Sequence, residues 1–206
     1  MSLHPSIAKV LAPAYAPCQA FAGPCSTMRW IPAQNHVPRG FLGATGRLDE
    51  VELVLVFAEP GDPRFDELTT DLESAYRVVS EGFEKRSDLF HRNVCGILDA
   101  CWPGLAFREQ MKRVWMTQSV LCSAPKSTGP VSTRVAKECG SRYLIGQLGL
   151  FPSALVVAMG SKARDRLRQI GVTGFLDVSA AAPPGCNHKG ARESWSRIPT
   201  ELARRK

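Results

Sequence analysis

Three short apolar segments constrain the fold of this chain more than any other feature. VELVLVF at residues 51–57 is nearly continuous in apolar and β-branched side chains, which predicts a strand buried on both faces of a parallel sheet. RVWMTQSVL at residues 113–121 and ALVVAM at residues 154–159 predict two further strands. A fourth, short strand is expected near residues 174–178.

Segments with helical spacing separate these strands. Residues 66–86 carry an apolar stripe with the spacing of an amphipathic helix. Further helices are expected over residues 93–101, 132–148 and 160–170, and from about residue 191. Strands that alternate with helices predict a three-layer α/β/α sandwich with a central four-stranded, mostly parallel sheet.

The first 47 residues differ from the rest because they are rich in proline and glycine. Proline at this density excludes long helices and central strands. We expect residues 1–47 to wrap around an α/β core formed by residues 48–206, so that residues 1–206 form a single domain, a size that 206 residues suit. The prolines of this segment are Pro5, Pro13, Pro17, Pro24, Pro32 and Pro38.

Charge and composition narrow the class of protein. The formal net charge is +7 and the sequence pI is about 9.2, a balance typical of proteins that bind polyanions. The alternative is a basic protein without such a partner. No apolar run approaches the length of a membrane span, and we expect no signal peptide, no membrane partner and a cytoplasmic location.

Three Pro/Gly-marked loops follow predicted strands, at residues 59–61, 123–130 and 182–188. Ligands of parallel α/β folds bind at the carboxyl ends of the strands, so these loops are expected to meet at one mouth. The turn Glu59-Pro60-Gly61 would then hold a carboxylate at the ligand crevice. The alternative is that Glu59 caps the following helix.

The order of short motifs resembles the uracil-DNA glycosylase superfamily, and most of all its iron–sulfur-cluster branch. Residues 57–61, FAEPG, stand where the family has a Gly-x-x-Pro-Gly turn, and residues 117–122, TQSVLC, stand where it has Thr-Asn-x-x-x-Cys. Phe90 matches the aromatic that stacks on the flipped base. Residues 139–148, 156–163 and 182–184 follow in the family's order, so the resemblance extends over about residues 51–195.

The chain departs from the family in its signature loops. Phe57 replaces the leading Gly, Ala58 stands where the closest branch has Glu, and Gln118 replaces the Asn that reads the uracil edge. Glu59 occupies the position before proline, where other branches have a catalytic Asp or Asn. The last loop has no His at its expected start, and His188 follows a few residues later.

The resemblance implies an enzyme that flips uracil out of DNA and hydrolyses its N-glycosidic bond, releasing free uracil. In this interpretation Glu59 stabilises the sugar cation or activates water, and His188 or main-chain amides stabilise the departing base. Ala58, Phe90 and Gln118 bind the uracil. The alternatives are that Phe90 belongs to the core, that Gln118 satisfies a backbone group at the strand end, and that His188 is an exposed surface histidine.

Basic residues beside the loops are candidates for DNA contact. Lys189 and Arg192 follow the last loop, and Lys126 and Arg134 flank the middle one. Phosphate contacts of this kind position DNA without reading its sequence. The alternative is that these side chains are solvated surface charges.

The seven cysteines are an odd number in a chain expected in a reducing compartment, which argues against a disulfide framework. The resemblance implies that Cys18, Cys25, Cys122 and Cys139 hold a 4Fe-4S cluster. Six residues separate the first pair, where the family has two. Zinc, or no metal, remains an alternative.

The resemblance implies a monomeric uracil-DNA glycosylase of DNA repair. A second interpretation is a superfamily member that binds nucleic acid or a base without hydrolysis, which the replaced Asn and the missing loop His favour. A third is a hydrolase of small nucleosides, against which the basic charge argues.

Overall fold

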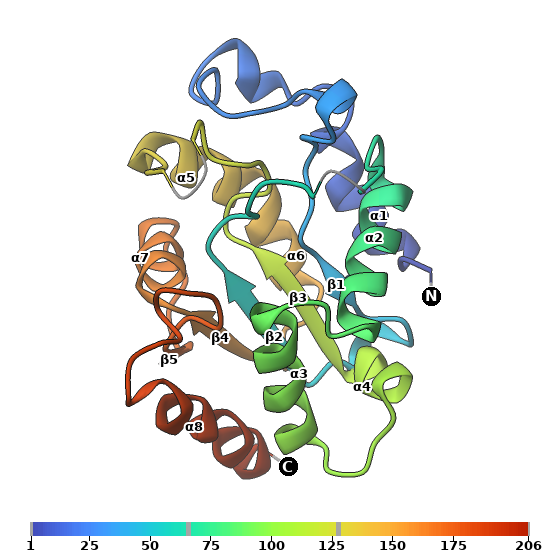
Figure 1. The fold of residues 1–206 in the computed structure, drawn as a ribbon, viewed down its shortest axis with the longest axis vertical. Helices are drawn as coiled ribbons and strands as arrows, with labels where there is room; N and C mark the ends of the chain where they lie inside the picture. The colour runs from blue at the N-terminus through green and yellow to red at the C-terminus, as the bar shows by residue number, and fades with distance from the viewer. Residues whose placement is uncertain (1, 65–66, 127–128, 206) are drawn as a thin grey trace.

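The computed structural model describes residues 2–64, 67–126 and 129–205, which form one five-stranded sheet covered by helices (Figure 1). The strand order is β1-β3-β2-β4-β5. Four strands run parallel, and β1 pairs antiparallel with β3. The strands are β1 (Leu42–Gly43), β2 (Leu53–Phe57), β3 (Val114–Gln118), β4 (Leu155–Met159) and β5 (Leu176–Val178).

The predicted α/β sandwich with a mostly parallel sheet is confirmed, and the sheet has one strand more than the four predicted. The additional strand is β1, from the proline-rich segment. Gly43 has a φ of +110°, and a Cβ there would lie 2.0 Å from the carbonyl oxygen of Val114. Only glycine permits so close an approach, and a strand of two residues leaves no alternation pattern in the sequence.

Helices cover both faces of the sheet (Figure 1). On one face α3 packs against α2 and α8, and on the other α5 packs against α7 and α1 against α6. No helix in the described residues is long and apolar enough to cross a lipid bilayer. The helices of that part are α1 (Pro5–Leu11), α2 (Leu72–Glu84), α3 (Leu89–Cys101), α4 (Phe107–Arg113), α5 (Thr133–Cys139), α6 (Ile145–Gly149), α7 (Ser161–Gln169) and α8 (Ala191–Arg204).

Helix α2 begins later than the apolar stripe suggests. Its predicted start, Asp66, lies outside the described residues, and the helix begins at Leu72. Asp71 is extended, with a φ of −148°, and its carboxylate accepts a hydrogen bond from the Ser74 N–H at 2.8 Å. This N-cap satisfies a donor of the first turn and therefore fixes the start of the helix.

A π-helical turn interrupts the helix predicted over residues 132–148. The turn, η5 (Gly140–Leu144), joins α5 to α6. It carries Arg142 and Tyr143, two residues that line the cysteine cavity described below. π-turns inside helices are frequent at functional sites.

The N-terminal segment lies along the loop that follows β3. The Arg29 N–H donates to the Ser123 carbonyl at 3.2 Å, and the Arg39 N–H donates to the Leu121 carbonyl at 3.0 Å. These backbone bonds bring residues 39 and 40 to the carboxyl end of β3. The proline-rich segment therefore contributes directly to the edge of the sheet where parallel α/β folds bind ligands.

Candidate functional site

A cleft of about 560 Å³ opens at the carboxyl ends of the parallel strands. Its lining includes the last residues of three strands, Phe57, Gln118 and Met159. Phe57 and Gln118 are paired across β2 and β3, so the segments that follow them lie side by side. The volume falls within the usual range for small-molecule and cofactor pockets.

Two of the three predicted loops line this cleft. Residues 59–61 contribute one wall, and Ala182 belongs to the last loop. The described residues of the 123–130 loop do not line it. Ser123 instead supports the cleft from behind, because its hydroxyl donates to the Gly61 carbonyl at 3.1 Å.

Glu59 lines the cleft and is held by two cations of α7. Lys162 Nζ donates to Glu59 Oε1 at 2.6 Å, and Arg166 Nη1 lies 2.5 Å from Glu59 Oε2. The second contact is an ion pair whose angles are not those of a hydrogen bond. The Glu59 side chain is 10% exposed. Glu59 does not cap α2, whose N-cap is Asp71, so that alternative is wrong.

The two cations differ in how they are held. Arg166 is 8% exposed, and its Nη1 donates to the Ala58 carbonyl at 2.8 Å and to the Ser119 hydroxyl at 3.1 Å. The Lys162 side chain is 50% exposed. Arg166 is therefore held behind the cleft lining by several contacts, whereas Lys162 is half exposed to solvent, and neither residue lines the cleft itself.

Gln118 is buried at the end of β3, and its Oε1 accepts no hydrogen bond from the described residues. A buried amide oxygen without a donor is costly, and the side chain lines the cleft. Oε1 therefore does not accept a hydrogen bond from a described backbone group at the strand end, as the alternative role of Gln118 would require. Oε1 is thus an acceptor that no described residue satisfies and that protein atoms cover, in a residue that lines the cleft.

Aromatic rings form another wall of the cleft. Phe90 is half-buried and packs edge-on against Phe57 and Phe83, with ring centroids 5.0 Å and 5.9 Å apart. All three line the cleft, as does His91 beside them. Phe90 therefore packs against the core and faces the cleft at the same time. A planar ligand would find an aromatic surface here.

Hydrogen bonds to the carbonyls of Ala58 and Gly61 fix the turn that carries Glu59. The Ala58 carbonyl accepts the Val120 N–H at 3.1 Å as well as the Arg166 guanidinium. The Gly61 carbonyl accepts a hydrogen bond from Nη2 of Arg39, a residue that is 5% exposed and lines the cleft. Ala58, predicted to bind uracil, is half-buried and lines the cleft too.

The remaining predicted residues lie outside the cleft lining. His188 is exposed, and its Nε2 lies 2.9 Å from the Ser179 hydroxyl. Lys126, Lys189 and Arg192 are exposed and do not line the cleft, and Arg134 on α5 is also exposed. Their predicted contacts with a ligand or DNA remain predictions.

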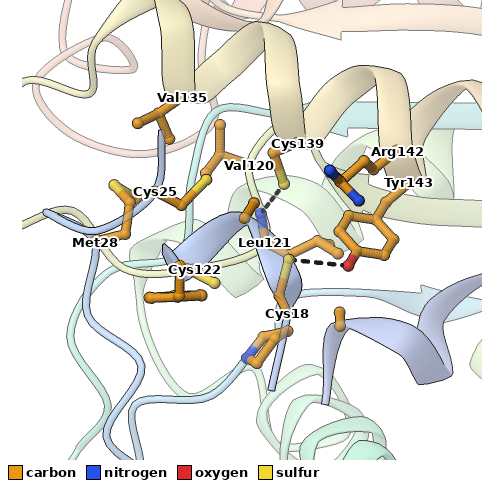
Figure 2. Close-up of a pocket in the computed structure, with 14 residues that line it drawn as sticks. Cys18, Cys25, Met28, Val120, Leu121, Cys122, Val135, Cys139, Arg142 and Tyr143 are labelled. Carbon is orange, nitrogen blue, oxygen red and sulfur yellow. Dashed lines mark hydrogen bonds between the residues drawn. The ribbon is translucent and has the colours of Figure 1, made fainter. Parts of the chain in front are cut away.

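The four predicted metal ligands line one small cavity, of about 20 Å³, on the other side of the 119–123 segment (Figure 2). Cys18 and Cys25 come from the N-terminal segment, Cys122 from the loop after β3, and Cys139 from the end of α5. Each is less than 9% exposed. The other three cysteines, Cys95, Cys101 and Cys186, do not line this cavity.

The donors around this cavity suit a thiolate-bound group. The Tyr143 hydroxyl donates to Cys18 Sγ at 3.1 Å, and the Leu121 N–H donates to Cys139 Sγ at 3.5 Å. Burial, followed by the neighbouring thiols, raises the pKa of Cys25 to about 11 and that of Cys122 well above its usual value. A bound cation reverses this effect, because coordination deprotonates a thiol.

Four cysteine thiols are a known ligand set for both zinc sites and 4Fe-4S clusters. A tetrahedral zinc ion with Zn–S bonds of about 2.3 Å requires sulfur atoms roughly 3.8 Å apart. Within the described residues, no three His, Cys, Asp or Glu side chains are grouped to hold one metal ion. The four thiols surround one cavity whose volume of about 20 Å³ is close to that of a single water molecule, so these thiols would have to move apart to hold a 4Fe-4S cluster.

Several residues of the site were missed by the sequence patterns. Arg39 and Gly40 come from the proline-rich segment and carry no motif. Lys162 and Arg166 are four positions apart on α7, directly after β4, so their spacing places them on one helix face, but it does not indicate Glu59 as their partner. His91 follows Phe90 and lines the cleft.

No family model matches the chain, and no curated protein matches it. A functional assignment therefore rests on the geometry of the cleft and the cysteine cavity.

Proposed function

We propose that the protein is a monofunctional uracil-DNA glycosylase of DNA repair, which flips uracil out of DNA and hydrolyses its N-glycosidic bond to leave an abasic site. The observation that carries this proposal is the buried carboxamide of Gln118. Its Oε1 has no hydrogen-bond partner among the described residues, and Gln118 lines the same cleft as Glu59 and Phe90.

Base recognition follows from the chemistry of these walls. A carboxamide offers one acceptor and two donors, so Gln118 pairs with the N3–H and O4 of uracil. Phe90 supplies an aromatic face, and flipped bases are commonly held by stacking and by hydrogen bonds to the Watson–Crick edge. The cleft of about 560 Å³ accommodates an extruded nucleotide.

Bond cleavage makes the sugar positive and the departing base negative. Glu59 stabilises the sugar cation and orients or deprotonates the attacking water. His188 is exposed and bonded to Ser179, so the departing base anion depends on other groups. Arg39, a buried guanidinium in the cleft wall, supplies a positive field there together with main-chain amides.

A 4Fe-4S cluster would be held by Cys18, Cys25, Cys122 and Cys139. When bound, it would tie the N-terminal segment to the loop after β3. That segment carries Arg39 and Gly40 to the cleft, so its anchoring positions two parts of the cleft wall. Zinc and a metal-free form are the alternatives.

The partners follow from this chemistry. The substrate is uracil-containing DNA, the product is free uracil, and the net charge of +7 supports salt-dependent binding to phosphates. We expect a monomer in the cytoplasm.

A second candidate is a non-catalytic protein that binds nucleic acid or a base in this cleft. The observation that favours it is the occupation of both Glu59 oxygens by Lys162 and Arg166. A carboxylate whose two oxygens already face cations stabilises a further positive charge poorly.

Single-turnover cleavage of a labelled oligonucleotide with one uracil, followed by alkali, tests the proposal. The matched substrate carries thymine at the same position. We expect cleavage at uracil, and a loss of roughly 10²–10⁴-fold in rate for Glu59→Gln, with DNA binding retained. Binding without cleavage of single- or double-stranded DNA would favour the second candidate.

A further inference from the structure

In the free protein both oxygens of Glu59 face a cation, and this arrangement opposes the proposed task of the carboxylate. Lys162 occupies Oε1 and Arg166 occupies Oε2. A water molecule or a sugar cation needs at least one of these oxygens. Because Oε2 is buried, Oε1 is the oxygen that a ligand would reach, and Lys162 competes with the ligand for it.

The structure distinguishes the fixed cation from the movable one. Arg166 is buried and bonded to the Ala58 carbonyl and the Ser119 hydroxyl, so its departure would leave a buried charge and two polar groups unpaired. Lys162 is half exposed, and its one ion pair in the described part of the chain is with Glu59. An ammonium on a flexible stem at the solvent edge exchanges partners at little cost.

We propose that Lys162 is a reversible latch on Glu59, which a DNA phosphate opens. In the free protein Lys162 pairs with Glu59 and neutralises it. When DNA covers the cleft, the ammonium moves to a backbone phosphate, and Glu59 Oε1 becomes available. Arg166 remains in place and keeps the carboxylate oriented. This inference rests on the proposed function, because it requires DNA to bind at this cleft.

The latch has a chemical consequence. Glu59 loses its ion pair with Lys162, and so becomes free to act, only where a phosphate accompanies the base. The site would then discriminate between uracil in a nucleic acid and free uridine-like molecules, which offer the same base without the polyanion. It also explains why the candidate catalytic carboxylate is neutralised in the free protein.

Zero-length cross-linking tests the latch without relying on catalysis. A water-soluble carbodiimide joins a carboxylate to an amine already in contact, with loss of water. It should therefore link Glu59 to Lys162 in the free protein, as mass spectrometry of the digested protein would show. Lys112 and Glu109, an exposed pair at 2.8 Å on α4, provide the matched control.

We expect saturating thymine-containing duplex to lower the Glu59–Lys162 cross-link at least fivefold and to leave the Glu109–Lys112 cross-link unchanged. Fluorescence anisotropy of the same sample verifies that the duplex is bound. An undiminished Glu59–Lys162 cross-link on bound DNA overturns the latch alone. Loss of the cross-link without cleavage of uracil DNA supports the latch and removes the glycosylase. Absence of both binding and cleavage overturns both.

Lys162→Met provides an independent readout. Methionine keeps the length of the side chain and removes the charge. On oligonucleotides with uncharged methylphosphonate linkages beside the uracil, we expect the variant to cleave at least threefold faster than the wild type. With natural phosphates, it should lose affinity, and the slope of log affinity against log salt should fall by about one. A slower variant on both substrates would assign Lys162 a fixed role instead.

Discussion

Gly40 lies directly against the carboxamide of Gln118. Its φ is +87°, and a Cβ at this position would lie 2.6 Å from Gln118 Nε2. Gly40→Ala should therefore displace the amide and impose a backbone strain of about 1–2 kcal/mol. We expect uracil cleavage to fall at least tenfold.

Gly104→Ala is the matched control for that change. Gly104 also has a positive φ, +77°, but an added Cβ would meet nothing within 4 Å. The Gly104→Ala variant should lose a similar free energy of unfolding in denaturant and keep the cleavage rate of the wild type. Equal losses of activity in the two variants would mean that strain, and not contact with Gln118, is responsible.

The unpaired oxygen of Gln118 predicts a conflict between stability and activity. Gln118→Leu replaces a buried acceptor without a donor by an apolar group of similar size. Because an unsatisfied buried polar group costs about 1–3 kcal/mol, the variant should resist urea as well as or better than the wild type while losing uracil cleavage. A large loss of stability would show that Oε1 has a structural partner.

The cysteine cavity predicts which thiols retain a cluster. Protein purified without oxygen should contain iron and sulfide and show the broad visible absorbance of a cluster. Cys139→Ala should lose this absorbance and most of the iron, because Cys139 lines the cavity. Cys95→Ala should retain both, since Cys95 is equally buried but lies outside the cavity lining. Iron-free wild-type protein would exclude the cluster.

The architecture could be predicted because it rests on strong local patterns. The strands that end at Phe57 and Gln118 are apolar runs whose residues are all buried. Such runs are typical of strands that are covered on both faces in a parallel sheet. Once they are placed, the carboxyl edge of the sheet follows, and with it the positions of Glu59 and Gln118. The structure brings these two residues to one cleft, as expected.

The rest of the site could not be predicted because it depends on contacts between distant segments. Arg39 reaches the turn at Gly61 only because backbone bonds dock the N-terminal segment beside β3. Lys162 meets Glu59 across 103 positions of sequence. His188 follows the last loop in the sequence, yet it does not line the cleft and its Nε2 contacts the Ser179 hydroxyl. The spacing of residues along the chain does not predict these tertiary contacts.

The N-cap of α2 predicts how stability depends on pH. The backbone N–H and hydroxyl of Ser74 bond to the Asp71 carboxylate and lower its pKa. A carboxyl whose pKa is lower in the folded state contributes stability above its unfolded pKa, about 3.9, and loses it as the pH falls through the folded value. Asp71→Ala should therefore cost about 1 kcal/mol at pH 7 and less below about pH 3.9.

Asp71→Asn separates capping from charge. Asparagine caps helices about as well as aspartate but does not titrate, so this variant should keep most of the stability at neutral pH and show a weaker decline in acid. Urea unfolding of the three proteins between neutral and acidic pH measures both effects. The opposing outcome is a free energy of unfolding that differs between wild type and Asp71→Ala by the same amount at every pH. The negative charge of Asp71 would then not contribute to the cap, and a neutral oxygen acceptor would be enough to fix the start of α2.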